Sequence, residues 1–153
     1  MVHIPSGAQI LTTIKRGSVY YFQHDFGDGK DGSKERHYFV VLNKNPKDNT
    51  FLVLACATSK VDKTKRIVST LGFPKNTIVE VSPSEYPIFS KNTIFDCNSV
   101  IEETIESIIE KRKNGKLRMC HQNMPDDIIQ CLIRGVLLST QVSIKAQNLV
   151  KEI

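Results

Sequence analysis

The sequence lacks any apolar run long enough to cross a membrane, because none approaches the roughly 18 residues that a spanning helix requires. Its amino terminus also lacks a basic segment followed by an apolar one, which is the pattern of a secretory signal peptide. Both absences argue against a membrane or secreted protein. We therefore expect a cytoplasmic protein that does not bind membranes.

Cysteine is scarce and irregularly spaced, with four residues at positions 56, 97, 120 and 131 and no C-x-x-C pair. Zinc sites need closely spaced ligand pairs, and Cys120-His121 alone does not supply one. Cys56, Cys97 and Cys131 lie within apolar segments, which predicts buried free thiols. We expect no metal and no other cofactor.

Residues 24–35 contain three glycines and charges of alternating sign, and they predict a surface loop that gates a ligand at one end of a sheet. Asp25, Asp28 and Asp31 are evenly spaced, as in a calcium loop. However, the bidentate glutamate at loop position twelve is missing, and the glycines do not match an EF-hand. The sequence does not predict calcium binding here.

The composition is that of one globular domain spanning residues 1–153. Hydrophobic residues make up 40% of the chain and charged residues 24%, which are ordinary values. The formal net charge of +5 weakly favours an anionic partner.

The strongest local signal is a predicted β-hairpin. Residues 36–43 and 50–57 are rich in β-branched and aromatic residues, and residues 44–49 between them are turn formers. Neither run alternates cleanly between apolar and polar residues. Both faces of each strand should therefore be covered, as in a small barrel with another element packed outside it.

Polar residues end both hairpin strands on the side away from the turn. Arg36 opens the first strand, and Thr58 and Ser59 close the second, so antiparallel pairing brings the three together. A guanidinium beside two hydroxyls at the rim of a rigid sheet predicts a phosphate site. The alternatives are a structural ion pair of Arg36 with Glu35 or a loop aspartate, and a plain β-forming role for Thr58.

Lysines on either side of this candidate site add positive charge. Residues 60–66 form a basic run that is either a solvated loop or a clamp for a nucleic-acid backbone. Lys34, Lys60 and Lys63 are accordingly candidate RNA-binding residues, together with His37 and Ser59.

The remaining segments predict further strands and two helices. Strands are expected at residues 17–23, 77–81, 92–97 and 116–121, an extended connector at 82–90, and a short strand or turn at 10–14. Apolar residues at 101, 105, 108 and 109 predict a helix over 101–113 that ends at Asn114-Gly115.

The carboxyl-terminal helix has the clearest pattern. Pro125 suits its first position, and a broad apolar stripe from Ile128 to Leu137 predicts that it covers the outer face of the sheet. The segment that follows either continues this helix or breaks at Ser139 and Thr140.

The order of these elements resembles the MazF/PemK family of ribonuclease toxins from bacterial toxin–antitoxin systems. The resemblance is carried by short segments that together span most of the chain, namely Gly17–Phe22, Arg36–Asn43, Val53–Ser59, Asn92–Asp96 and Pro125–Leu138. It implies a mainly β, α+β fold, with a small SH3-like β-barrel and a C-terminal α-helix packed on it. It also implies a homodimer and a cognate antitoxin protein as partner.

The resemblance further implies an enzyme, a metal-independent endoribonuclease that cleaves single-stranded RNA by attack of the ribose 2′-hydroxyl on the adjacent phosphate. Arg36 and Thr58 match the catalytic pair of the family. Arg36 would stabilise charge on the phosphorane oxygens, and Thr58 would add a neutral hydrogen bond.

Proton transfer is not assigned by this match. Arginine is a poor acid near neutral pH, whereas the imidazole of His37 titrates in the useful range. Strand alternation, however, points His37 and Arg36 to opposite faces, so a packed or surface histidine is the alternative.

The chain departs from the family pattern at two places. His37 stands where family members carry proline, and Asp96-Cys97-Asn98 replaces an Arg and Asp pair of the PemK branch, so the acid and base of that branch are not carried over. Two other functions fit the same barrel. One is a non-catalytic protein binder that acts through a helix surface, like the gyrase-poisoning relatives, and the other is an RNA-binding module without cleavage.

Overall fold

The computed structural model describes residues 4–24 and 35–151, and it has the predicted α+β architecture. The strands are β1 (Val19–Gln23), β2 (Arg36–Val41), β3 (Phe51–Thr58), β4 (Ile78–Val81), β5 (Thr93–Asp96), β6 (Ile101–Thr104) and β7 (Leu117–Met119). The helices are α1 (Ser6–Thr13), α2 (Val61–Thr70), α3 (Ile105–Lys113), α4 (Asp126–Leu138) and α5 (Ile144–Val150), with short 3₁₀ turns η2 (Pro46–Asp48) and η3 (Lys75–Thr77).

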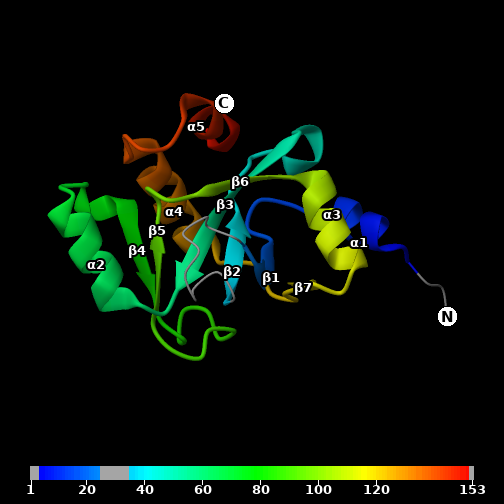
Figure 1. The fold of residues 1–153 in the computed structure, drawn as a ribbon, viewed down its shortest axis with the longest axis horizontal. Helices are drawn as coiled ribbons and strands as arrows, with labels where there is room; N and C mark the ends of the chain where they lie inside the picture. Colours follow the sequence, from blue (N-terminus) through cyan, green and yellow to red (C-terminus); the bar gives the residue numbers. More distant parts are fainter. Residues whose placement is uncertain (1–3, 25–34, 152–153) are drawn as a thin grey trace.

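The seven strands form one antiparallel sheet with β3 at its centre. The order is β4-β5-β3-β2-β1-β7. Two strands share one edge of β3: β6 pairs with residues 51–54 of β3, and β5 pairs with residues 57 and 58. The sheet bends around β3 like an SH3-type barrel (Figure 1). It remains open, because no pairing joins β6 to β7 among the described residues.

Both faces of the sheet are buried, as the hairpin sequences predict. On one face, Val40, Ala55 and Ala57 pack in a cluster with the apolar stripe of α4 and with α5. On the other, Phe39 and Leu54 pack in a cluster with α1 and α3. We call these the α4 face and the α3 face. Figure 1 shows α1 and α3 side by side, on the opposite side of the sheet from α4.

The carboxyl-terminal helix packs on the sheet as predicted, and Gly135 allows a very close approach to η3 and to Cys97, the residue after β5. A Cβ atom at this position would lie 2.7 Å from Cys97 Sγ and 3.0 Å from the Asn76 carbonyl oxygen. The helix ends at Leu138, which confirms the break at Ser139 and Thr140. Pro125 is the residue before the first helical turn rather than within it.

Three predictions about local structure are wrong. Residues 10–14 are helical up to Thr13, because Ile10 and Ile14 are four residues apart and both are buried on one side of α1. The basic run 60–66 is the start of α2 and not a loop. Within α2, Val61, Thr64 and Val68 have helical spacing. They are the residues of this helix that are shielded from solvent.

The third error concerns the predicted helix 101–113, whose first four residues are strand β6. Residues 101–104 pair with residues 51–54 of β3, so tertiary pairing overrides the helical spacing of the isoleucines. Thr104 then starts α3, since its hydroxyl accepts a hydrogen bond from the Ser107 N–H at 3.1 Å.

The cysteine prediction holds fully for Cys97, which is buried, whereas Cys56 and Cys131 are only half-buried. All four cysteines are free. Burial raises the pKa of the Cys56 and Cys97 thiols to about 12. No helix in the described part of the chain is long and apolar enough to span a membrane.

Candidate functional site

A pocket of about 180 Å³ opens where β2 begins and β3 ends, at the position predicted for the phosphate site. We call it the lip pocket. Its charged lining residues are Glu35, Arg36 and Lys91, its other polar residues include His37, Thr58, Ser59, Ser90 and Thr93, and its aromatic residues are Tyr21, Tyr38 and Phe89. The structure thus brings Arg36, His37, Thr58 and Ser59 to one place.

The four residues reach the lip pocket from opposite faces of the sheet. Strand alternation places Thr58 on the α3 face with Cys56. Arg36 has the phase of Tyr38 on the α4 face, but at the start of β2 it also lines a second pocket with Lys111 of α3. His37 shares the α3 face with Phe39. Because Arg36 and Thr58 are the terminal residues of their strands, side chains from both faces can line the same pocket.

Arg36 is exposed, and none of the ion pairs found between described residues involves it. The alternative of a structural pair with Glu35 is therefore not seen. Arg36 also lines a second pocket of about 630 Å³, which we call the α3 pocket. A guanidinium located between two open pockets is well placed to bind an anion.

Thr58 is half-buried, and its hydroxyl has a defined orientation. Thr58 Oγ1 accepts a hydrogen bond from the Lys60 backbone N–H at 3.2 Å, just before α2 begins at Val61. The contact uses a lone pair of the oxygen and leaves the hydroxyl hydrogen to donate to an acceptor in the pocket. Thr58 is therefore held by the turn into α2.

The orientation of the His37 ring is set by β3. His37 Nδ1 lies 3.1 Å from the Ala57 carbonyl oxygen, which can only accept a hydrogen bond. Nδ1 must therefore carry the proton, and in the neutral ring the lone pair is on Nε2. Nε2 lies 4.0 Å from Glu35 Oε2, another residue of the lip pocket. The contact with β3 therefore fixes the ring orientation.

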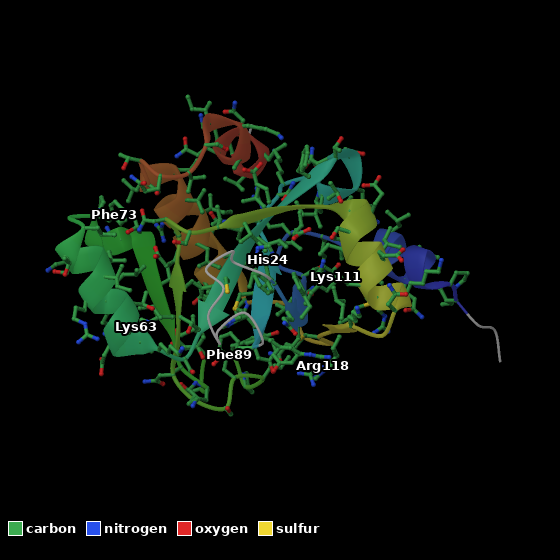
Figure 2. All side chains as sticks on the ribbon, in the orientation of Figure 1. His24, Lys63, Phe73, Phe89, Lys111 and Arg118 are labelled. Carbon is green, nitrogen blue, oxygen red and sulfur yellow. The ribbon has the colours of Figure 1, made fainter. Side chains whose placement is uncertain are left out.

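The predicted RNA-binding lysines do not contribute to the lip pocket. Lys60 and Lys63 are exposed residues at the start of α2, and neither lines the lip pocket or the α3 pocket. Figure 2 shows Lys63 on α2, on the other side of the molecule from Arg118 and Lys111. Lys65 of the same run forms an ion pair with Glu80 at 2.8 Å. Lys34 and the aspartates of the predicted gating loop lie outside the described residues.

Three other lysines supply the positive charge that sequence reasoning assigned to Lys60 and Lys63. Lys91 lines the lip pocket, and Lys111 and Lys116 line the α3 pocket beside Arg36. Lys111 is oriented by a hydrogen bond from Nζ to Ser107 Oγ at 3.1 Å. No local motif identifies these lysines, because the fold alone brings the end of the 82–90 connector and α3 next to the hairpin.

No group of three or more His, Cys, Asp or Glu side chains within residues 4–24 and 35–151 could hold a metal ion. The chain matches no known family model, and no curated protein is similar to it.

Proposed function

We propose that the protein is an endoribonuclease that cleaves single-stranded RNA by attack of a ribose 2′-hydroxyl on the adjacent phosphate, without a metal ion. One observation carries the proposal. The lip pocket combines a guanidinium with no ion pair to another described residue, a hydroxyl free to donate, and an imidazole of defined orientation. These are the groups that such a transfer requires: an anion stabiliser, a hydrogen-bond donor and a proton acceptor.

In the proposed reaction, His37 Nε2 takes the proton of the 2′-hydroxyl as its oxygen bonds to phosphorus. The bond from phosphorus to the 5′-oxygen breaks, and that oxygen takes a proton from water. The products are a 2′,3′-cyclic phosphate and a 5′-hydroxyl. Arg36 stabilises the charge that develops on the non-bridging oxygens, and Thr58 donates to one of them.

The biological role that we propose follows from the sequence resemblance to MazF/PemK toxins. The protein would arrest growth by degrading RNA in the cytoplasm, act as a homodimer, and be neutralised by a cognate antitoxin protein. A neighbouring gene for a small acidic protein would support this role.

The test is incubation of the purified protein with mixed-sequence RNA in EDTA, followed by mapping of the product ends. Arg36→Ala is expected to lower the cleavage rate by about 10²- to 10³-fold, the loss typical of one preorganised donor. Arg134→Ala is the matched control, because Arg134 is also an exposed arginine but lies on α4 and lines neither the lip pocket nor the α3 pocket. It should cleave at the wild-type rate.

Two results would overturn the proposal. Cleavage by Arg36→Ala at the wild-type rate would remove the lip pocket as the active site. Salt-sensitive RNA binding by the wild-type protein without any product would instead identify an RNA-binding module, with log K falling by about 0.7 per log unit of salt for each phosphate contacted.

A further inference from the structure

Strand β4 is an end strand of the sheet, and its outer edge is open. Among the described residues β4 pairs only with β5 (Figure 1). The Cys97 N–H donates to the Thr77 carbonyl at 2.8 Å, and bonded and non-bonded pairs alternate along an antiparallel ladder. Val79 therefore forms ladder hydrogen bonds to β5, whereas the backbone groups of Ile78 and Glu80 point away from β5.

Three backbone groups on this outer edge have no protein partner within the described part of the chain. The Ile78 N–H is not one of them, because it donates to the Lys75 carbonyl at the end of η3. That bond agrees with the outward direction of Ile78. The three groups are the Ile78 carbonyl and the N–H and carbonyl of Glu80. A strand added at this edge can bond to all three, because it presents N–H and C=O groups at the matching spacing.

A groove of about 440 Å³ borders the open edge, and we call it the β4 groove. One wall is formed by residues 76 and 78–80, and the other by Cys131, Arg134 and Leu138 of α4. These three helix residues are three and four positions apart, so they lie on one side of α4. A groove between a strand edge and a helix suits an extended chain, whose backbone pairs with the strand while alternate side chains face the helix.

The β4 groove combines an exposed apolar side chain with one positive charge that no carboxylate pairs. Leu138 is 48% exposed on the helix wall, so a partner side chain can bury it. Glu80 already forms an ion pair with Lys65 at 2.8 Å. Arg134 is exposed and takes part in no ion pair between described residues, and its Nη2 contacts only a cysteine sulfur of its own helix, at 3.5 Å. Its remaining N–H groups can bind a carboxylate.

A second copy of the chain is a poorer match to the β4 groove. In a two-fold symmetric pairing, the same surface of each copy meets the other. Each copy would then bring the positive charge of Arg134 to the contact and no free carboxylate, since Glu80 is paired with Lys65. Like charges facing each other across an interface oppose binding, whereas an acidic partner gains from the same guanidinium.

We propose that the β4 groove binds an extended, acidic segment of a partner protein, which adds to β4 as a further strand. A carboxylate of the segment binds Arg134, and an apolar side chain two residues away, on the same face of the segment, packs on Leu138. The β4 groove shares no lining residue with the lip pocket or the α3 pocket. The inference therefore does not depend on the proposed function.

The probe is a fluorescein-labelled hexapeptide, Val-Thr-Asp-Thr-Val-Thr, in which the aspartate and both valines share one face of a strand. Binding to the full chain is measured by anisotropy. Asparagine in place of the aspartate, and Arg134→Gln in the protein, should each weaken binding about two- to fivefold, as for one exposed ion pair. The two changes together should cost no more than either alone. Arg118→Gln is the matched control, because Arg118 is also exposed but lies on β7, at the other end of the sheet.

A second pair of peptides tests strand addition itself. N-methyl groups on the odd residues block one edge of the extended peptide, and N-methyl groups on the even residues block the other. One isomer should bind about 5- to 140-fold more weakly, because it lacks the donors to the Ile78 and Glu80 carbonyls, and the other should stay within about threefold. Equal binding by the two isomers would overturn the proposal. So would a preference for aspartate that persists in Arg134→Gln, or no binding of the unmodified peptide at about 1 mM.

Sedimentation velocity tests the competing occupant, a second copy of the chain. Whatever the oligomeric state of the protein, its mass should be the same with and without saturating peptide. Dissociation of a dimer by the peptide would show that a second copy occupies the β4 groove, and the proposal of a partner segment would then be wrong.

Discussion

Replacing His37 with asparagine separates its structural contact from its proposed chemistry. The asparagine Nδ2 occupies nearly the same place as the imidazole Nδ1, so it can keep the hydrogen bond to the Ala57 carbonyl that His37 makes at 3.1 Å. Asparagine has no group that accepts a proton near neutral pH. It should therefore fold like the wild type and lose the proton acceptor of the reaction.

The expected loss in the rate of the chemical step is about 10²- to 10⁴-fold, the usual contribution of a general acid or base. The assay is single-turnover cleavage of a short RNA with enzyme in excess at neutral pH.

The charged groups that line the same pocket must be separated from His37 in this experiment. They are Glu35, whose Oε2 is 4.0 Å from His37 Nε2, together with Arg36 and Lys91. Glu35→Gln and Lys91→Gln keep the imidazole and should cleave faster than His37→Asn. A His37→Asn rate within about threefold of the wild type would show that the imidazole only packs against β3.

Two further predictions concern stability. Asn43 is fully buried, donates to the Phe51 carbonyl at 2.8 Å and accepts from the Val53 N–H at 2.6 Å; Asn43→Ala leaves both backbone groups unpaired and should lower the free energy of unfolding in urea by about 2–5 kcal/mol, whereas a change below 1 kcal/mol would mean that these bonds are replaced. Burial raises the pKa of Cys97 to about 12, above the roughly 8.5 of a thiol in the unfolded chain, so the unfolded state loses its proton first as pH rises. Below about pH 8.5 the contribution of Cys97 to the free energy of unfolding does not depend on pH. Between about pH 8.5 and 12 the free energy of unfolding should fall by up to about 1.4 kcal/mol per pH unit because of this thiol. Cys97→Ala should show a shallower fall, and an equal slope would contradict the assignment.

The hairpin of β2 and β3 was predictable because several local signals agree there. β-branched residues, a turn-forming segment and apolar residues on both faces all indicate two covered strands, and both faces are buried. Helices α1 and α2 were not predictable in the same way. Their apolar residues are few and are separated by lysine, threonine and serine. Such short helices are stable only when their apolar side packs on another part of the protein.

In the candidate site, too, the residues placed by local pairing were predictable and those placed by tertiary packing were not. Arg36, Thr58 and Ser59 were predictable because antiparallel pairing alone brings the two strand ends together. Lys91 and Lys111 were not, because they come from a connector and a helix whose positions depend on tertiary packing. The basic run at the start of α2 lies outside the lip pocket, since proximity in sequence to Thr58 does not place its side chains there.

Strand alternation was the argument against a shared role for Arg36 and His37, and the structure shows why it does not decide the question. In the middle of β2, alternation separates neighbours completely, because Phe39 and Val40 belong to different buried clusters. At the strand end, by contrast, both residues line the lip pocket. The buried length of β2 and β3 fixes the register, since a shift by one residue would exchange every apolar contact between the faces. The same register therefore places His37 beside the Ala57 carbonyl and Arg36 at the start of β2, so that both side chains line one small pocket.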